Sequence, residues 1–190
     1  MKYLFSLILL VFVAFGISAQ NAGVVVQTGL SMGYAKDVNI IQRGAANYGV
    51  MFGADARILD GGLQFLVGVQ YHAISLQAAK TPKFFSNNDW RVVMGRFGIG
   101  FSLYQLDNGA LLRSKLLASI NFNNSAPDGA LNIPGYKDLN ESFIGLTTGL
   151  GITKGAYDID LEYQYGLLNA YFEKPKTVFD FWTLMVGFNF

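Results

Sequence analysis

The sequence contains no cysteine and only one histidine, His72. The lack of cysteine excludes disulfide bonds, thiolate chemistry, cysteine-ligated zinc and a lipoprotein anchor attached through cysteine. A single histidine excludes a metal site with several histidine ligands. An excess of one charge is also lacking, because the formal net charge of the 190-residue chain is +1. A chain without a basic excess is not expected to bind nucleic acid.

Long apolar runs are absent beyond the first 20 residues. The chain is 52% hydrophobic and only 14% charged, which is apolar for a soluble protein. Even so, no later stretch stays apolar and uncharged over the roughly 18 residues that a membrane helix needs. Apolar residues are spread in alternation instead, among 22 glycines and 15% aromatic residues. This composition suits β-strands better than helices.

The first 19 residues are predicted to be a cleaved signal peptide. Lys2 provides a minimal positive start, residues 3–15 form an apolar core, and Gly16, Ser18 and Ala19 supply small residues before the cleavage site. We expect cleavage after Ala19, which leaves residues 20–190 as one domain with Gln20 at its start. An uncleaved anchor helix is the alternative, but the apolar run is shorter than a typical span of about 20 residues.

Eight segments of the mature chain alternate between apolar residues and polar or small ones. They cover residues 24–34, 48–58, 63–73, 93–103, 112–122, 144–152, 157–167 and 182–190. In the most regular segment, one face holds Tyr157, Ile159, Leu161, Tyr163, Tyr165 and Leu167, and the other holds Asp158, Asp160, Glu162, Gln164 and Gly166. Strands of a membrane barrel show this alternation, with apolar side chains towards lipid and polar ones towards the lumen.

The connections between these segments alternate between short and long. The short ones, at 60–62, 107–109 and 154–155, contain the Asp, Asn and Gly residues of tight hairpins. The long ones are polar and cover roughly 35–46, 77–88, 123–140 and 169–177. Outer-membrane barrels combine short periplasmic turns with long outer loops. The predicted fold class is therefore all-β: an eight-stranded antiparallel transmembrane β-barrel with both termini periplasmic. A soluble β-sandwich or lipocalin-like barrel is the alternative, and it would bury the apolar face.

The sequence resembles a known group at three places. These are a signal peptide ending in residues 17–20, eight alternating strands, and a final Gly187-Phe188-Asn189-Phe190. Together they resemble the small outer-membrane β-barrel proteins of Bacteroidota, the PorT-like group, and the architecture is similar to the OmpX and OmpA barrels. Phe190 resembles the terminal aromatic signal that barrel-assembly machinery reads. The resemblance covers about the whole mature chain and implies architecture, but it brings no catalytic motif.

Charged residues on the inward faces are predicted to form an ion-pair network in the lumen. The set comprises Asp55, Arg57, Arg96, Arg113, Lys115, Asp158, Asp160 and Glu162. An eight-stranded barrel has an interior just wide enough for side chains to fill, so charges there must pair or stay hydrated. A structural plug is the favoured interpretation. A gated or proton-conducting path is the alternative, and catalysis by paired carboxylates is disfavoured because basic residues are expected opposite them.

His72 is the one imidazole that could act as a base. Small outer-membrane lipid-modifying enzymes use serine and histidine, but alternation points His72 inward and the nearby Ser75 outward. No GxGxxG-then-helix or P-loop pattern occurs, so no cofactor is expected. Basic and aromatic residues of the outer loops could bind lipopolysaccharide phosphates or a partner protein, or serve as interfacial anchors. They are Lys36, Arg43, Lys80, Lys83, Phe84, Phe85, Lys137, Tyr171, Phe172, Lys174 and Lys176.

These features favour a non-enzymatic barrel in the outer membrane of a Gram-negative bacterium. Its role is predicted to be structural or surface-interacting, with an accessory place in a larger envelope complex as one form of it. The alternatives are a narrow, porin-like channel for ions or small solutes and a lipid-modifying enzyme. The expected partners are outer-membrane lipid and lipopolysaccharide, the barrel-assembly machinery and other envelope proteins.

Overall fold

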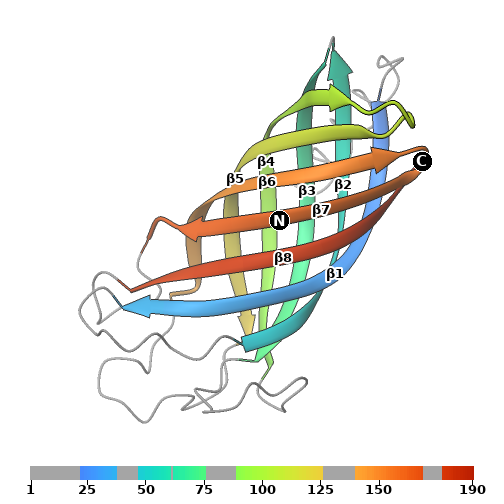
Figure 1. The fold of residues 1–190 in the computed structure, drawn as a ribbon. Helices are drawn as coiled ribbons and strands as arrows, with labels where there is room; N and C mark the ends of the chain where they lie inside the picture. The colour runs from blue at the N-terminus through green and yellow to red at the C-terminus, as the bar shows by residue number, and fades with distance from the viewer. Residues whose placement is uncertain (1–21, 38–46, 61, 76–88, 126–139, 169–176) are drawn as a thin grey trace, which may run out of the picture.

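Eight antiparallel strands close into a single barrel in the computed structural model (Figure 1). The structure describes residues 22–37, 47–60, 62–75, 89–125, 140–168 and 177–190. The strands are β1 (Ala22–Asp37), β2 (Asn47–Asp60), β3 (Leu63–Ser75), β4 (Asp89–Gln105), β5 (Leu111–Ser125), β6 (Ser142–Lys154), β7 (Tyr157–Gly166) and β8 (Thr177–Asn189). Each strand pairs with its sequence neighbour, and β8 closes the barrel by pairing with β1 from Val25↔Asn189 to Asp37↔Thr177. The predicted all-β, eight-stranded fold is confirmed, whereas the predicted signal peptide lies outside the described residues.

Period-two alternation separates a polar inner wall from an apolar outer wall. Along β7, Ile159 and Leu161 are 56% and 47% exposed, while their neighbours Asp158, Asp160 and Glu162 are at most 3% exposed. The same alternation holds over β6, whose odd-numbered residues from Phe143 to Gly151 are buried. Successive side chains of a strand point to opposite faces, so closure turns this alternation into an inside and an outside. The predicted facing of the strands is confirmed.

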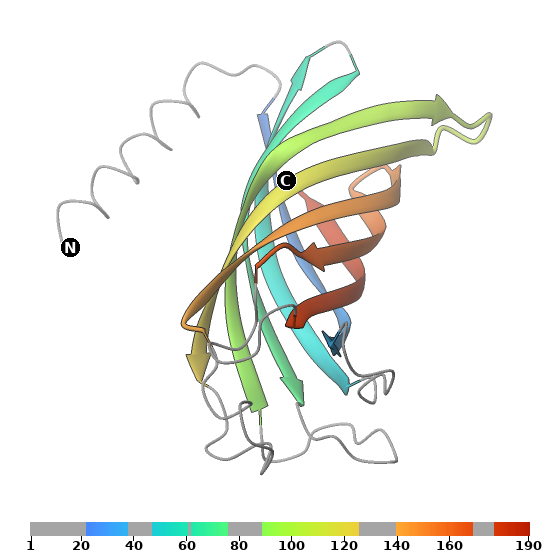
Figure 2. The same cartoon turned by 90° about the vertical axis from the view of Figure 1, so that its left-hand side faces the viewer.

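Tight glycine turns join the strands at one end of the barrel. Gly62, Gly109 and Gly155 adopt positive φ angles of 94°, 79° and 61° at the β2–β3, β4–β5 and β6–β7 connections. Positive φ carries no steric penalty in glycine, which explains why each predicted short turn contains one. We call this end the turn end and the opposite one the loop end. The β4–β5 hairpin projects at the turn end (Figure 2).

The strands extend further than the alternating segments predicted. β1 continues to Asp37 and β8 begins at Thr177, so these strands take in part of the predicted loops 35–46 and 169–177, and β4 begins at Asp89, four residues before its predicted segment. The reason is that backbone pairing continues beyond the segment in which apolar side chains face outward and polar ones inward, as the β1–β8 ladder shows. Ladder hydrogen bonds need only backbone groups, whereas the sequence pattern reports which side chains are half-buried.

Large apolar side chains fill the lumen at the loop end. Ile74, Val92, Phe143, Phe179 and Phe181 are at most 1% exposed. The ring of Phe143 lies 5.7 Å from that of Phe179 and 6.3 Å from that of Phe181, measured between centroids. The sequence pattern predicted an inward face of mainly polar and small residues, and it did not predict these large aromatic side chains there. Phe179 and Phe181 were not assigned to the last strand, so their inward facing was missed.

A charged network in the barrel lumen

The eight predicted lumen charges all lie inside the barrel. Each is at most 5% exposed: Asp55, Arg57, Arg96, Arg113, Lys115, Asp158, Asp160 and Glu162. They project from β2, β4, β5 and β7, where alternation directs them inward. Buried charges of this kind are strongly destabilising unless they are paired and hydrogen-bonded, so their partners decide what the lumen can do.

Arg96 joins the walls of the barrel through two carboxylates. Its Nε donates to Asp55 Oδ1 at 2.8 Å, and its Nη2 donates to Asp55 Oδ2. Its Nη1 donates to Glu162 Oε2 at 2.7 Å. Gln27 adds a hydrogen bond from Nε2 to Asp55 Oδ2 at 2.7 Å. A guanidinium suits this task, because its planar fork can serve two acceptors at once.

Lys115 continues the network from Glu162 to the next carboxylate. Its Nζ lies 2.5 Å from Glu162 Oε1 and 3.2 Å from Asp160 Oδ1. Glu162 is therefore held between Arg96 on one side and Lys115 on the other. This places a cation against each oxygen of the carboxylate.

Two arginines and two aspartates complete the network as a ring. Arg57 Nη1 lies 2.5 Å from Asp158 Oδ2, and its Nη2 lies 3.7 Å from Asp160 Oδ2. Arg113 Nη2 lies 3.3 Å from a carboxylate oxygen of each aspartate. The four cations and four anions thus form one connected network that crosses the lumen between β2 and β7, and their formal charges cancel.

Glycines on the intervening strands make these contacts geometrically feasible. Gly68 on β3 is in register with Asp55 on one side and Arg96 on the other. Gly149 on β6 is likewise in register with Lys115 and Glu162, and a Cβ there would meet Glu162 Cγ at 2.9 Å and Lys115 Cε at 3.1 Å. Each glycine leaves the space over its own backbone to a charged pair from the two neighbouring strands.

His72 extends the polar contacts towards the middle of the barrel. Its Nδ1 lies 2.8 Å from Ser31 Oγ on β1. When the Gln70 amide is oriented to satisfy both neighbours, its nitrogen donates to His72 Nε2 at 3.0 Å and its oxygen accepts from Arg96 Nη1 at 2.6 Å. His72 Nε2 is then an acceptor, so Nδ1 carries the proton and donates to Ser31. The sequence singled out Ser75, whose side chain lies outside the described residues, and missed Ser31 because strand register cannot be read from alternation.

A buried acid outside the network was also missed. Asp180 on β8 is 1% exposed, although the alternation of Phe179 and Phe181 into the lumen places it on the outer face. Its carboxylate accepts from Tyr163 Oη at 3.0 Å and from the Gly166 backbone N–H at 3.3 Å. Extending the alternation backwards from 182 would have revealed an acid on the outward face.

The remaining candidate residues lie apart from the network. Phe190 is 76% exposed at the turn end, and its ring packs edge-on against Phe188 at 4.8 Å between centroids. The Lys36 side chain, together with all the other predicted basic and aromatic loop residues, lies outside the described residues. Within the part of the chain that the structure describes, no cluster of three or more metal-ligating side chains occurs. Among those same residues, no helix is long and apolar enough to cross a bilayer.

A closed barrel of eight antiparallel strands with an apolar outer wall and a charged lumen is the fold of the small outer-membrane β-barrels. Among solved structures, Neisserial surface protein A matches it with a TM-score of 0.57 and 14% identity, over 90% of this chain and 100% of that one. Ail, the attachment invasion locus protein of Yersinia pestis, matches with a TM-score of 0.51 and 13% identity over the same shares. At such identities the likeness establishes the fold alone. No family model and no curated protein sequence matches the chain.

Proposed function

We propose that this chain is a non-enzymatic outer-membrane β-barrel of a Gram-negative bacterium, with a structural or surface-interaction role. The observation that carries the proposal is the filled lumen. The charged network occupies the turn end and middle, and Phe143, Phe179 and Phe181 occupy the loop end. A lumen occupied by these side chains favours a scaffold for the loops over a conduit.

The orientation follows from the connections. The turn end would face the periplasm, and the longer connections 38–46, 76–88, 126–139 and 169–176 would face outward. Outward loops with an excess of lysine suit an anionic surface partner, such as the phosphates of lipopolysaccharide. One of the Ail structures similar to this chain is a complex with the heparin analogue sucrose octasulfate, also a polyanion.

The buried Ser31–His72 pair supports a role without catalysis. Both side chains are 1% exposed. The ring of Phe181 lies 5.9 Å from the imidazole, between centroids, on its loop-end side. His72 Nε2 faces the amide of Gln70, whereas catalytic serine–histidine pairs are usually oriented by a carboxylate. On this proposal the Ser31–His72 hydrogen bond has a structural role in the lumen.

Two finer assignments belong to this proposal: an accessory place in a larger envelope complex, and membership of the PorT-like barrels of Bacteroidota that the sequence resembles. On this proposal Phe190 is the terminal residue read by the barrel-assembly machinery. Co-purification from native membranes should recover a defined set of envelope proteins, and recovery of the barrel alone would contradict the accessory role.

Conductance in a planar bilayer tests the scaffold role against a channel. The intact barrel should show little steady conductance. If the barrel instead conducts steadily, and Arg113→Ala changes its ion selectivity without lowering its unfolding midpoint, the scaffold proposal is wrong. The barrel would then be a narrow channel.

A further inference from the structure

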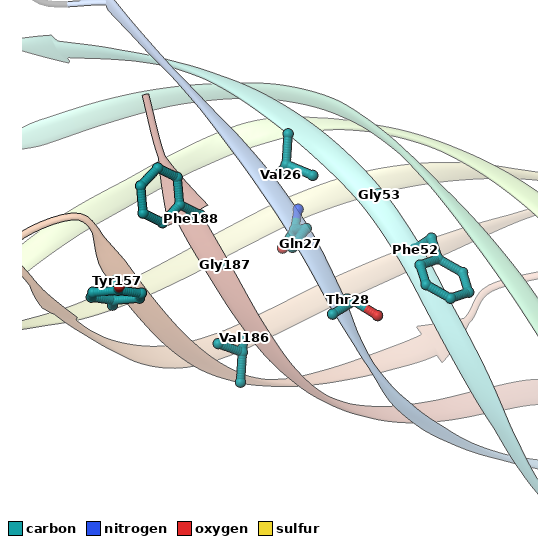
Figure 3. Close-up of a pocket in the computed structure, with 9 residues that line it drawn as sticks. All are labelled: Val26, Gln27, Thr28, Phe52, Gly53, Tyr157, Val186, Gly187 and Phe188. Atoms are coloured by element: carbon teal, nitrogen blue, oxygen red, sulfur yellow. The ribbon is translucent and has the colours of Figure 1, made fainter.

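A groove of about 460 Å³ runs along the outer wall over β1 (Figure 3). The side chains that shape it come from four strands and are Val26, Thr28, Phe52, Tyr157, Val186 and Phe188. Phe52 on β2 stands at one side of Thr28, and Val186 and Phe188 on β8 stand at the other (Figure 3). A short side chain between large ones hollows the wall at this point.

The chemistry of the groove favours an apolar occupant. Phe52, Val186 and Phe188 are 55%, 53% and 40% exposed, and Val26 adds a further aliphatic surface. The hydroxyl of Thr28 already donates to the carbonyl oxygen of Met51 at 3.1 Å. The hydroxyl donor is therefore satisfied within the barrel. A molecule in the groove would be stabilised by dispersion contacts and by burial of its apolar surface away from water.

The turn end of the groove has a different character. Tyr157 is 64% exposed there, and its ring packs edge-on against Phe188 with centroids 5.5 Å apart. Lys154 is in register with Tyr157 on the neighbouring strand, and it is exposed on the same outward face. A phenol hydroxyl and an ammonium group at paired positions of neighbouring strands are groups that can bind a phosphate by charge-assisted hydrogen bonds.

We propose that this groove binds one anionic glycerophospholipid, with an acyl chain along Thr28 and the phosphate at Lys154 and Tyr157. The inference rests on the proposed function in one respect, which is that the outer wall faces lipid. The groove is continuous with that wall, because Leu184 and Val24 extend the same apolar surface beyond it. The phosphate end lies at the turn end, where the proposed orientation places the periplasmic leaflet.

Native mass spectrometry of the full mature chain in detergent, titrated with phosphatidylglycerol or with phosphatidylcholine of the same acyl chains, tests this proposal. Wild type should retain one phosphatidylglycerol above the statistical background. Thr28→Trp fills the groove and should weaken retention several-fold. Thr148→Trp is the matched control, because Thr148 is an exposed, outward threonine on β6, away from the groove. Lys154→Gln should remove the preference for phosphatidylglycerol over phosphatidylcholine.

Equal retention by wild type, Thr28→Trp and Thr148→Trp would overturn the proposal, because the lipid would then belong to a non-specific shell. A second measurement distinguishes failure of the lipid site from failure of the outer-membrane function. The same proteins are added to phospholipid vesicles, and insertion is detected by their shifted migration in unheated gels. Wild type that inserts but shows no groove dependence overturns the lipid site alone. Wild type that does not insert overturns the outer-membrane function together with it.

Discussion

Asp55 and Arg96 meet over the backbone of Gly68, a residue of the strand that separates theirs. The register places Asp55 beside Gly68 in the β2–β3 ladder and Arg96 beside Gly68 in the β3–β4 ladder. Arg96 Nε reaches Asp55 Oδ1 at 2.8 Å across this gap. The ion pair therefore depends on glycine at position 68, because any side chain there would occupy the space in which the two groups meet.

Gly68→Ala should destabilise the barrel by about 1–3 kcal/mol, the usual effect of overpacking. A Cβ at position 68 would overlap the Asp55 carboxylate and the backbone carbonyl of Ala54. Urea unfolding in phospholipid vesicles, followed by tryptophan fluorescence, measures the change. Gly95→Ala on β4 is the control, because its nearest heavy atom beyond its own neighbours would be Ile120 O at 3.9 Å. Equal stability of the two variants would contradict the role of Gly68.

Arg96→Met should cost more stability than Arg113→Met. Without Arg96, Asp55 loses the one cation that the described residues place against it, and an uncompensated buried charge costs roughly 3–5 kcal/mol. Without Arg113, Asp158 keeps Arg57 and Asp160 keeps Lys115. Unfolding midpoints in urea give the order of the two variants.

A matched control and a double variant complete this test. Arg91→Met removes an exposed arginine from the same strand and should leave the midpoint nearly unchanged. Adding Asp55→Asn to Arg96→Met removes the orphaned charge and should recover part of the loss. No recovery would mean that Arg96 acts through packing of its stem, and the ion-pair account would be wrong.

Cysteine labelling tests which wall of the barrel meets lipid. The chain has no native cysteine, so single cysteines can be placed without background. Probes at 161, 163 and 165 should be quenched by lipid-borne quenchers and protected from water-soluble reagents, because these residues face outward on β7. Leu150→Cys on β6 serves as a second outward site, since Leu150 is 57% exposed. Labelling from the aqueous phase at all of these sites would indicate a soluble barrel.

Mass spectrometry of protein isolated from cells tests the predicted export signal. The mature chain should begin at Gln20, in its free or cyclised form, because small residues precede that position. A mature chain that retains Met1 would contradict cleavage. A variant with Ala19→Leu should accumulate as the uncleaved precursor, since signal cleavage needs a small residue there.

The facing of residues was predictable where one physical rule decides it. A strand with one wall in lipid and one in a polar lumen must alternate, and Asp158, Asp160 and Glu162 followed directly from that rule. The glycine turns were predictable for a similar reason, because positive φ selects glycine at Gly62, Gly109 and Gly155.

Register and cross-lumen partners were not predictable in this way. Ser31 contacts His72 and Arg57 contacts Asp158 only because of the stagger between strands, which alternation does not encode. The sequence predicted basic residues opposite the β7 carboxylates, but it did not reveal that Arg57 and Arg113 share Asp158. Asp180 was overlooked because residues 178–181 were assigned neither to the last strand nor to the loop before it, although backbone pairing with β1 continues through them.

The network is also divided unevenly between two halves of the barrel. The lumen side of β2–β4 carries Arg57, Arg96 and Asp55, a sum of one positive charge. The lumen side of β5–β7 carries Arg113 and Lys115 against Asp158, Asp160 and Glu162, a sum of one negative charge. Asp55–Arg96 and Lys115–Glu162 can each form within three consecutive strands, whereas Arg57 and Asp158 are separated by 101 residues and meet across the lumen. The opposite net charges of these two lumen faces therefore favour closure of the barrel, which brings Arg57 to Asp158 and Arg96 to Glu162.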